Sequence, residues 1–393
     1  MERQDLPFLD LTVTGFSTRS PEVLAARMAA PFARTPFGIA VLRHHEAGVV
    51  LRDRRLRQGS HNWPDLQDLQ GSFAGFWRRS IISQEGAAHK ALRRVAMAAL
   101  SADFVSGLKP DFRAVAEGLI AKMPRDETIE FISDFSEPFA GLAITRLLGL
   151  LDADAPALAH DASRLGLAMG IGAKAQEPVF NAACDRLMGL ADHLIARVRA
   201  GEDRTHFVAR LVGGAGDLSD QELRDLIVIA IFGGVDTTRA QLGFAIGLFI
   251  EHPAEWQALR GDPGLIPNAI EEVIRTRPTT TWATRQALED LEISGTTIRR
   301  GEVVHVLVHA SGRDPVVMAD QRFDIKVPRK IHFGFGGGAH HCLGQFVART
   351  DMAEALAVLA ENWRSITWDG SPEWLPDSGN TSPVFLPIRP VWD

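Results

Sequence analysis

The spacing of apolar residues predicts a chain built mainly from helices. Between about residues 87 and 260, apolar positions recur every three to four residues, which is the period of a helix with one buried face. The pattern breaks at Pro110, Pro124, Pro138 and the glycine-rich segment 213–216, where helices tend to start or stop. We therefore predict a succession of helices across this region.

The most apolar stretch of the chain, residues 226–250, approaches the length of a membrane span. Asp236, Arg239 and Gln241 lie inside it, and charged groups at the centre of a bilayer are costly. We expect a buried central helix here and no membrane segment.

Short β-like segments lie on both sides of the helical region. Residues 38–42 and 48–51 are brief apolar runs of the kind found in strands, although 48–51 also fits a helix. Residues 291–293 and 296–298 alternate between apolar and polar positions across a turn glycine, which is typical of a hairpin.

A loop-rich stretch at 312–339 is followed by one last helical pattern at 345–360 and by proline-punctuated strands. No internal repeat or low-complexity linker divides the chain. The expected fold is therefore mainly α with a minor β portion, in a single domain spanning 1–393.

Composition is ordinary for a soluble globular enzyme, with 46% hydrophobic and 23% charged residues among 393. The net charge of −7, without any basic run, argues against a nucleic-acid binder. Residues 1–15 have neither the positive nor the apolar region of a signal peptide. The two cysteines, Cys184 and Cys342, are too few for a disulfide framework and suit a reducing compartment, so we expect a cytoplasmic protein.

Cys342 lies in a glycine- and histidine-rich loop, F-G-G-G-A-H-H-C-L-G, at 335–344. The glycines allow sharp turns and a close approach to a flat cofactor, and loop N–H groups can stabilise a thiolate. The N-terminus of the helix expected from Gln345 would do the same. The alternatives are a buried free cysteine and a zinc site with His340 and His341, but adjacent residues cannot surround a tetrahedral zinc ion. The pattern favours a single thiolate ligand.

The segment G-G-V-D-T-T at 233–238 carries a second candidate site. Each glycine inside a helix costs about 1 kcal/mol relative to alanine, which indicates that a flat group packs against the helix or that the helix deforms. Asp236 and Thr237 are an acid and an alcohol able to relay protons to reduced oxygen. A helix kink, or a threonine bonded to a backbone carbonyl, would also explain the pattern.

The spacing F-G-x-G-x-H-x-C-x-G at 335–344 resembles the haem-binding loop of the cytochrome P450 family. The segment 233–238 resembles the oxygen-activating helix of the same family, and the resemblance continues over nearly the whole chain. It implies the cytochrome P450 fold, with haem buried between the helix of Asp236 and Thr237 and the loop and helix of Cys342. It makes Cys342 the iron ligand and gives Asp236 and Thr237 catalytic roles.

The resemblance also assigns the contacts to the cofactor, haem b (iron protoporphyrin IX). In the loop these are Phe335, Gly336, His340 and Gly344; elsewhere they are His89, Arg93 and Arg285, which with His340 would hold the propionates. Without the resemblance, His89 and Arg93 would form an ordinary basic helix face.

A docking face for the redox partner is expected near these contacts. Lys90 and Arg94 are rotated by about 100° from the haem-facing pair on the same helix and should face outward. With Arg349 they would attract an acidic electron donor.

Glu272 and Arg275 are an acid and a base three residues apart on one helical face, alone an ordinary surface pair. The resemblance implies a buried pair with a structural role, fixing the region that carries the cysteine loop. Arg322 is our candidate for a third member, because Val327 occupies the position where many bacterial relatives have arginine.

The resemblance places the substrate pocket in four segments. Its expected lining is Phe73, Phe76, Trp77, Ile229, Phe232, Gly233, Thr280, Trp282, Thr381 and Val384. Most are apolar, so we expect a small to medium, neutral organic substrate. Alternatively, some of them, Phe73 and Trp282 above all, only pack the core, or Arg78 and Arg79 bind a substrate carboxylate.

The function implied is a haem-thiolate monooxygenase that inserts one oxygen atom from O2 into a C–H bond, by hydroxylation or oxidative dealkylation. The chain is too short for a fused flavin reductase, so electrons would come from a ferredoxin-type donor and an NAD(P)H-dependent reductase. We expect a monomer. The alternatives are peroxide-driven oxygenation, oxidative coupling, or a non-catalytic haem- or ligand-binding protein.

Overall fold

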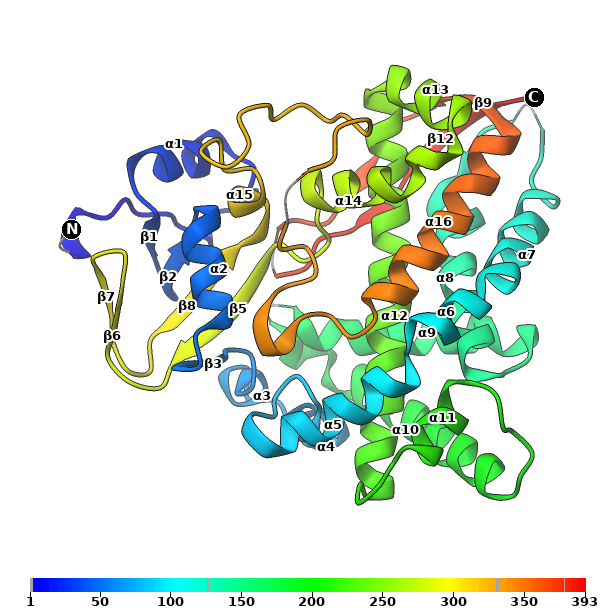
Figure 1. Ribbon diagram of the computed structural model, residues 1–393, viewed down its shortest axis with the longest axis horizontal. Helices are drawn as coiled ribbons and strands as arrows, with labels where there is room; N and C mark the ends of the chain where they lie inside the picture. The colour runs from blue at the N-terminus through cyan, green and yellow to red at the C-terminus, as the bar shows by residue number, and fades with distance from the viewer. Residues whose placement is uncertain (1–2, 126, 171, 330–331, 378) are drawn as a thin grey trace. The chain divides into compact units, whose positions relative to one another are not determined.

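The computed structural model describes residues 3–125, 127–170, 172–329, 332–377 and 379–393. The chain forms two compact units, each assembled from stretches distant in sequence (Figure 1). Unit 1 comprises Met1–Ser60, Pro267–Cys342 and Trp374–Ser382, and unit 2 comprises His61–Ile266, Leu343–Glu373 and Pro383–Asp393. The expectation of a single domain stays a prediction.

Unit 1 is built around a mixed five-stranded sheet. Its strand order is β1 (Phe32–Thr35), β2 (Gly38–Val41), β8 (Val303–Leu307), β5 (Trp282–Ala287) and β3 (Leu56–Gln58). Only β2 and β8 pair in parallel within it; the other neighbours are antiparallel. A separate hairpin joins β6 (Leu291–Ile293) to β7 (Thr296–Ile298). The helical elements are η1 (Arg3–Asp5), α1 (Pro21–Ala29), α2 (His44–Arg52), α14 (Ile266–Thr276), α15 (Val308–Gly312) and η7 (Gly338–His340). The chain passes from unit 2 to unit 1 within β10 (Glu373–Trp374).

The strands predicted at 38–42, 291–293 and 296–298 are confirmed. The segment 48–51 belongs instead to α2, the helical alternative, because Val50 and Leu51 are buried as one apolar helix face. Gly38 shows why glycine opens β2: its φ is +130°, and a Cβ there would lie 2.1 Å from the Val303 carbonyl oxygen.

Unit 2 is predominantly helical. Its main helices are α3 (Trp63–Leu66), α4 (Gly71–Arg79), α5 (Gly86–Ala99), α6 (Ala102–Gly107), α7 (Lys109–Ile120), α8 (Glu137–Leu148), α9 (Ala155–Gly166), α10 (Glu177–Arg199), α11 (Phe207–Gly213), α12 (Asp220–Glu251), α13 (Pro253–Gly261) and α16 (Gln345–Asn362). Short helical turns are η2 (Ile132–Ser136), η3 (Asp152–Asp154), η4 (Leu167–Met169), η5 (Ala173–Gln176) and η6 (Pro263–Leu265). β12 (Pro387–Trp392) pairs on either side with β4 (Ile129–Glu130) and β9 (Trp363–Trp368), and β11 (Pro383–Phe385) precedes it.

The breaks in the apolar pattern fall at helix ends, as predicted. Pro110 lies in the first turn of α7, where a missing N–H costs little because it would have no partner within that helix. Pro138 is the second residue of α8, where the π-helical turn η2 passes directly into the α-helix. Gly213 is the last residue of α11.

α12 crosses unit 2, with α8, α9 and α10 packed along it (Figure 1). It begins at a reciprocal capping box between Ser219 and Glu222. By length and composition α12 alone among the helices of the described residues could cross a membrane, but 56% of its most apolar window is buried. This fits the predicted central core helix.

Candidate active site

The cysteine loop in unit 1 has a backbone that requires its glycines. Gly336 and Gly338 both have φ of +68°, and a Cβ on Gly338 would lie 2.0 Å from the Leu51 carbonyl oxygen at the end of α2. The loop is closed by the Cys342 N–H, which donates to the Phe335 carbonyl oxygen at 2.9 Å. The Cys342 side chain is only partly buried, so its thiol is accessible to a ligand.

Arg285, on β5, lies against this loop. Its side chain is buried, and Nη2 donates to the carbonyl oxygens of Gly337 at 3.1 Å and Leu51 at 3.5 Å. His340, at the end of η7, is half-buried. Unit 1 thus holds the predicted thiolate ligand and His340 in one short loop, with Arg285, another predicted propionate partner, packed against it.

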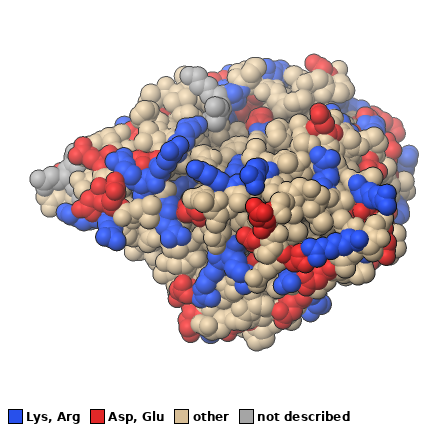
Figure 2. All heavy atoms as spheres, turned by 60° about the horizontal axis from the view of Figure 1, so that its bottom comes forward, with Lys and Arg blue, Asp and Glu red and all other residues tan. Residues whose placement is uncertain are grey.

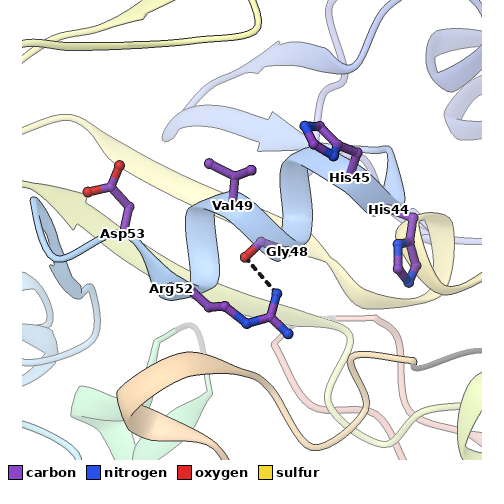
Figure 3. Close-up of a pocket in the computed structure, with 6 residues that line it drawn as sticks. All are labelled: His44, His45, Gly48, Val49, Arg52 and Asp53. Atoms are coloured by element: carbon purple, nitrogen blue, oxygen red, sulfur yellow. Dashed lines mark hydrogen bonds between the residues drawn. The ribbon is translucent and has the colours of Figure 1, made fainter.

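A hollow of about 530 Å³ runs along α2, lined by His44, His45, Gly48, Val49, Arg52 and Asp53 (Figure 3). Arg52 bends back along the helix, where Nη1 donates to the Gly48 carbonyl oxygen at 3.1 Å. None of the predicted pocket residues lines this hollow, so it carries no argument about substrate.

The second candidate segment lies in the middle of α12, in unit 2. Asp236 Oδ1 accepts a hydrogen bond from Nη2 of Arg239 at 2.7 Å. Thr237 Oγ1 donates to the Gly233 carbonyl oxygen at 2.6 Å. The bond from threonine to a carbonyl, which the sequence left open, is therefore present, and α12 continues unbroken through this point.

The two glycines of this segment serve different purposes. A Cβ on Gly234 would lie 2.3 Å from Cδ1 of Ile144 on α8, so glycine leaves room for this side chain between the two helices. At Gly233 no heavy atom of the described residues lies within 4 Å of the Cβ position, the helix's own nearby backbone aside. Gly233 therefore leaves open space beside Asp236 and Thr237.

Asp351 is a buried carboxyl group that the sequence analysis did not identify. It lies on α16, and its Oδ2 accepts a hydrogen bond from Thr238 Oγ1 at 3.3 Å. Burial raises the pKa of Asp351 well above its usual value, because desolvation disfavours the charged form. Asp351 therefore joins α16 to α12 next to Thr237.

Lys90 and Arg94 on α5 face outward, as predicted. His89 is buried and Arg93 is half-buried, whereas Lys90 and Arg94 are exposed. Arg349, on α16, is half-buried, and its Nη1 donates to Oε1 of Gln345 at 2.8 Å.

Glu272 and Arg275 form a fully buried ion pair on α14, as predicted. Nε and Nη2 of Arg275 donate to the two carboxylate oxygens at 2.7 and 2.6 Å, and neither side chain has exposed surface. The Asp324 N–H donates to Glu272 Oε1 at 3.1 Å. The pair therefore holds the segment that leads toward the cysteine loop.

The prediction of Arg322 as the third member was wrong. Arg322 is 83% exposed and pairs with Asp320. Arg329 takes its place, with Nε 3.5 Å from Glu272 Oε2 and a side chain only 6% exposed. The backbone at Asp320 turns Arg322 outward, because the Asp320 carboxylate binds both the N–H and the guanidinium of Arg322.

The predicted pocket residues differ in exposure. Phe73, Phe76 and Trp77 are buried, and Phe73 stacks on Trp77 with ring centroids 5.7 Å apart; these contacts fit a core role. Half-buried or exposed members are Ile229, Phe232, Gly233 and Val384 in unit 2, and Thr280 and Trp282 in unit 1. Thr381 is buried, and its hydroxyl donates to the Leu375 carbonyl oxygen.

Cys184 has the environment of an inert cysteine. It is completely buried on α10, and burial raises the pKa of its thiol to about 12. A protonated, inaccessible thiol is a poor metal ligand, which leaves Cys342 as the candidate.

Arg329, Arg239, Asp351 and His332 are the site neighbours that sequence reasoning missed. His332 accepts the Gly334 N–H at Nδ1 and contacts Glu271 through Nε2, both at 3.0 Å, and so fixes the start of the cysteine loop. A charged residue inside an apolar helix was the available signal for Arg239.

Comparison with known proteins decides the family. A family model described as Cytochrome P450 matches residues 264–390. The luteothin monooxygenase of Streptomyces thioluteus is 36% identical over 396 residues, covering 98% of this chain and 96% of the relative. The chain belongs to the cytochrome P450 family. It is accordingly an oxidoreductase, a haem-thiolate monooxygenase acting on an organic substrate, with haem iron as cofactor, O2 as co-substrate and redox partners as electron source.

Other relatives agree with this assignment. The mycinamicin IV hydroxylase/epoxidase of Micromonospora griseorubida is 30% identical over 374 residues, 91% of each chain. The crystal structure of CalO2 superposes with a TM-score of 0.87 at 26% identity, covering 96% of this cytochrome P450 and 99% of CalO2. The predicted mainly α fold with a minor β portion is thereby confirmed.

Proposed function

We propose that this cytochrome P450 inserts one oxygen atom from O2 into a C–H bond of a neutral, mainly apolar organic molecule, using haem b held by Cys342. The observation that carries the proposal is the open space beside Gly233, next to Asp236 and Thr237 on α12. A flat cofactor or a small oxygen species needs open space of this kind beside a helix whose other residues are closely packed.

The residues present fit haem. The partly buried Cys342 thiol and the glycine backbone around it suit a single axial ligand. We propose that Arg285, His340, His89 and Arg93 hold the propionates, and that Phe335, Gly336 and Gly344 shape the loop around the cofactor. When bound, haem with a thiolate ligand supplies the activation of O2.

The protein's own contribution is to hold the substrate and to deliver protons. Asp236 is anchored through Oδ1, so its second oxygen can exchange a proton with water. Thr237 presents its hydroxyl one residue further on, fixed by the Gly233 carbonyl. We propose that Asp236 supplies protons and that Thr237 orients them toward reduced oxygen.

The pocket is proposed to be apolar, lined by Ile229, Phe232, Gly233, Thr280, Trp282 and Val384. The carboxylate alternative loses support because both arginines already have partners. Arg79 pairs with Asp225 at 2.9 Å and Arg78 with Asp65 at 2.6 Å. Neutral compounds are therefore the first to test.

Luteothin is the first compound to test, because a luteothin monooxygenase is 36% identical to this chain. The holoenzyme would be assayed with luteothin, a surrogate ferredoxin and reductase, NADPH and ¹⁸O2. Product containing one ¹⁸O atom is expected. Product that takes its oxygen from added hydrogen peroxide and not from O2 would favour the peroxide-driven alternative.

Replacing Thr237 by alanine should separate oxygen reduction from product formation. Thr237→Ala is expected to keep its haem and to consume O2, but to release about tenfold more hydrogen peroxide per product, because a positioned proton donor is lost. Thr350→Ala is the matched control, because the Thr350 hydroxyl makes the same kind of bond to the Phe346 carbonyl on α16. Equal peroxide yields in both variants would remove Thr237 from the mechanism.

The electron donor is proposed to be an acidic ferredoxin, served by an NAD(P)H-dependent reductase, that docks on Lys90 and Arg94 with Arg349 nearby. Lys90 and Arg94 are exposed on one side of α5. Figure 2 shows basic side chains interspersed with acidic ones on one face of the molecule, so local basic surface coexists with the net charge of −7.

The protein is further proposed to be a cytoplasmic monomer.

Charge reversal at Arg94 should weaken this docking. Arg94→Glu is expected to lower ferredoxin-supported turnover about tenfold at low salt, with the difference vanishing near 0.5 M salt, because screening removes steering between exposed charges. Arg164→Glu, an exposed arginine on α9, is the control. If both variants turned over equally at low salt, the docking face would be elsewhere.

A further inference from the structure

Arg239 is a charged residue in the apolar middle of α12, and its side chain is only 15% exposed. A nearly buried guanidinium must be paired and hydrogen-bonded to be tolerated. Its partners are Asp236, at 2.7 Å through Nη2, and the Pro383 carbonyl oxygen, at 3.4 Å through Nη1. One side chain therefore links the proposed proton-delivery acid to the first residue of β11.

A glycine in α12 allows β11 to pack closely against this helix. Gly243, one turn beyond Arg239, lies directly under Pro383: a Cβ on it would lie 2.4 Å from Cγ of the Pro383 ring. Glycine at this position lets the strand pack against the helix backbone, which brings the Pro383 carbonyl within reach of Arg239.

The ion pair with Arg239 leaves one carboxylate oxygen of Asp236 available for proton transfer. Asp236 and Arg239 are three residues apart on one helical face, with the acid on the N-terminal side, the favourable order for such a pair. In the described part of the chain the contact is through Oδ1 alone, and the Asp236 side chain is 25% exposed. Oδ2 can thus exchange protons with water while Oδ1 stays anchored.

We propose that Arg239 is a positioning residue: it fixes the Asp236 carboxylate for proton delivery and ties it to the segment at Pro383–Phe385. This inference rests on the proposed function, in which Asp236 supplies protons. Val384, in the same segment, is a proposed pocket residue and is 46% exposed. Movement of the pocket wall would therefore be transmitted to the acid through one guanidinium.

The test compares Arg239→Gln, Arg239→Lys, Asp236→Asn and the double variant Asp236→Asn/Arg239→Gln. Arg224→Gln is the matched control, because Arg224 also lies on α12 and pairs with Asp192 at 2.6 Å, away from Asp236. All variants are studied as holoenzymes without added substrate, with a surrogate ferredoxin and reductase. The readouts are haem content, the rate of NADPH oxidation and its solvent deuterium isotope effect.

Arg239→Gln is expected to keep its haem, to oxidise NADPH about tenfold more slowly and to show a larger solvent isotope effect, as for a misplaced proton donor. Arg239→Lys should recover part of the rate. The double variant should be no slower than Asp236→Asn, because residues that act through one another are non-additive. A wild-type rate and isotope effect in Arg239→Gln, or fully multiplicative losses in the double variant, would overturn the proposal.

A second readout does not depend on activity. Hydrogen–deuterium exchange of a peptide covering 383–386 should be about threefold faster in Arg239→Gln and unchanged in Arg224→Gln, because a lost tertiary contact favours local opening. Unchanged exchange in Arg239→Gln would show that Arg239 does not hold the strand and would overturn that half of the proposal. A wild-type rate in Asp236→Asn would instead refute the proton-delivery role of Asp236, and the exchange data would still test the tie to Pro383.

Discussion

Cys342→His is expected to lose the red-shifted Soret band that marks a ferrous–CO complex with thiolate ligation, and with it all monooxygenase activity. The physical reason is that imidazole is a neutral ligand and does not donate electron density to iron as a thiolate does. The measurement is the reduced CO difference spectrum of purified protein, together with turnover. Both the red-shifted band and the turnover should be lost completely, because the substitution replaces the iron ligand itself.

The matched control for this experiment is Cys184→Ala. Cys184 is fully buried in α10 and acts as a small apolar side chain, so its removal should leave the thiolate band intact. A thiolate band that persisted in Cys342→His and vanished in Cys184→Ala would reverse the assignment.

Glu272→Gln is expected to destabilise the protein by about 3–5 kcal/mol, the usual cost of removing one partner of a buried ion pair. The substitution leaves Arg275, with no exposed side-chain surface, and Arg329, with 6%, without their carboxylate. It also weakens the bond from the Asp324 N–H. The loss would appear as a lower denaturation midpoint and as lower haem content, because the cysteine loop follows the segment that Glu272 holds.

Glu117→Gln is the control that removes the same charge from an exposed ion pair. Glu117 pairs with Arg113 at 2.9 Å on α7, but its side chain is 54% exposed, so the cost should stay within about 0.5 kcal/mol. Equal midpoints for Glu272→Gln and Glu117→Gln would show that the buried pair does not stabilise unit 1.

Local features of this protein could be predicted from its amino-acid sequence alone. Pro110 marked a helix start because proline is favoured in the first turn, where no intrahelical N–H bond is needed. The loop around Cys342 was predictable because glycine at 336 and 338 permits a backbone that other residues rarely adopt. The faces of α5 followed from the rotation between successive residues, which separates buried His89 from exposed Lys90.

Contacts between side chains distant in the sequence became visible only in the folded structure. The resemblance to bacterial relatives suggested Arg322 beside Glu272, but the turn at Asp320 directs Arg322 outward and Arg329 occupies the buried place. Neither Asp351 beside Thr238 nor Pro383 beside Arg239 has a local sequence signal, since 113 and 144 residues separate the partners. Short-range patterns fix backbone conformation and the direction of a side chain, whereas partners across a core depend on how whole helices and strands pack.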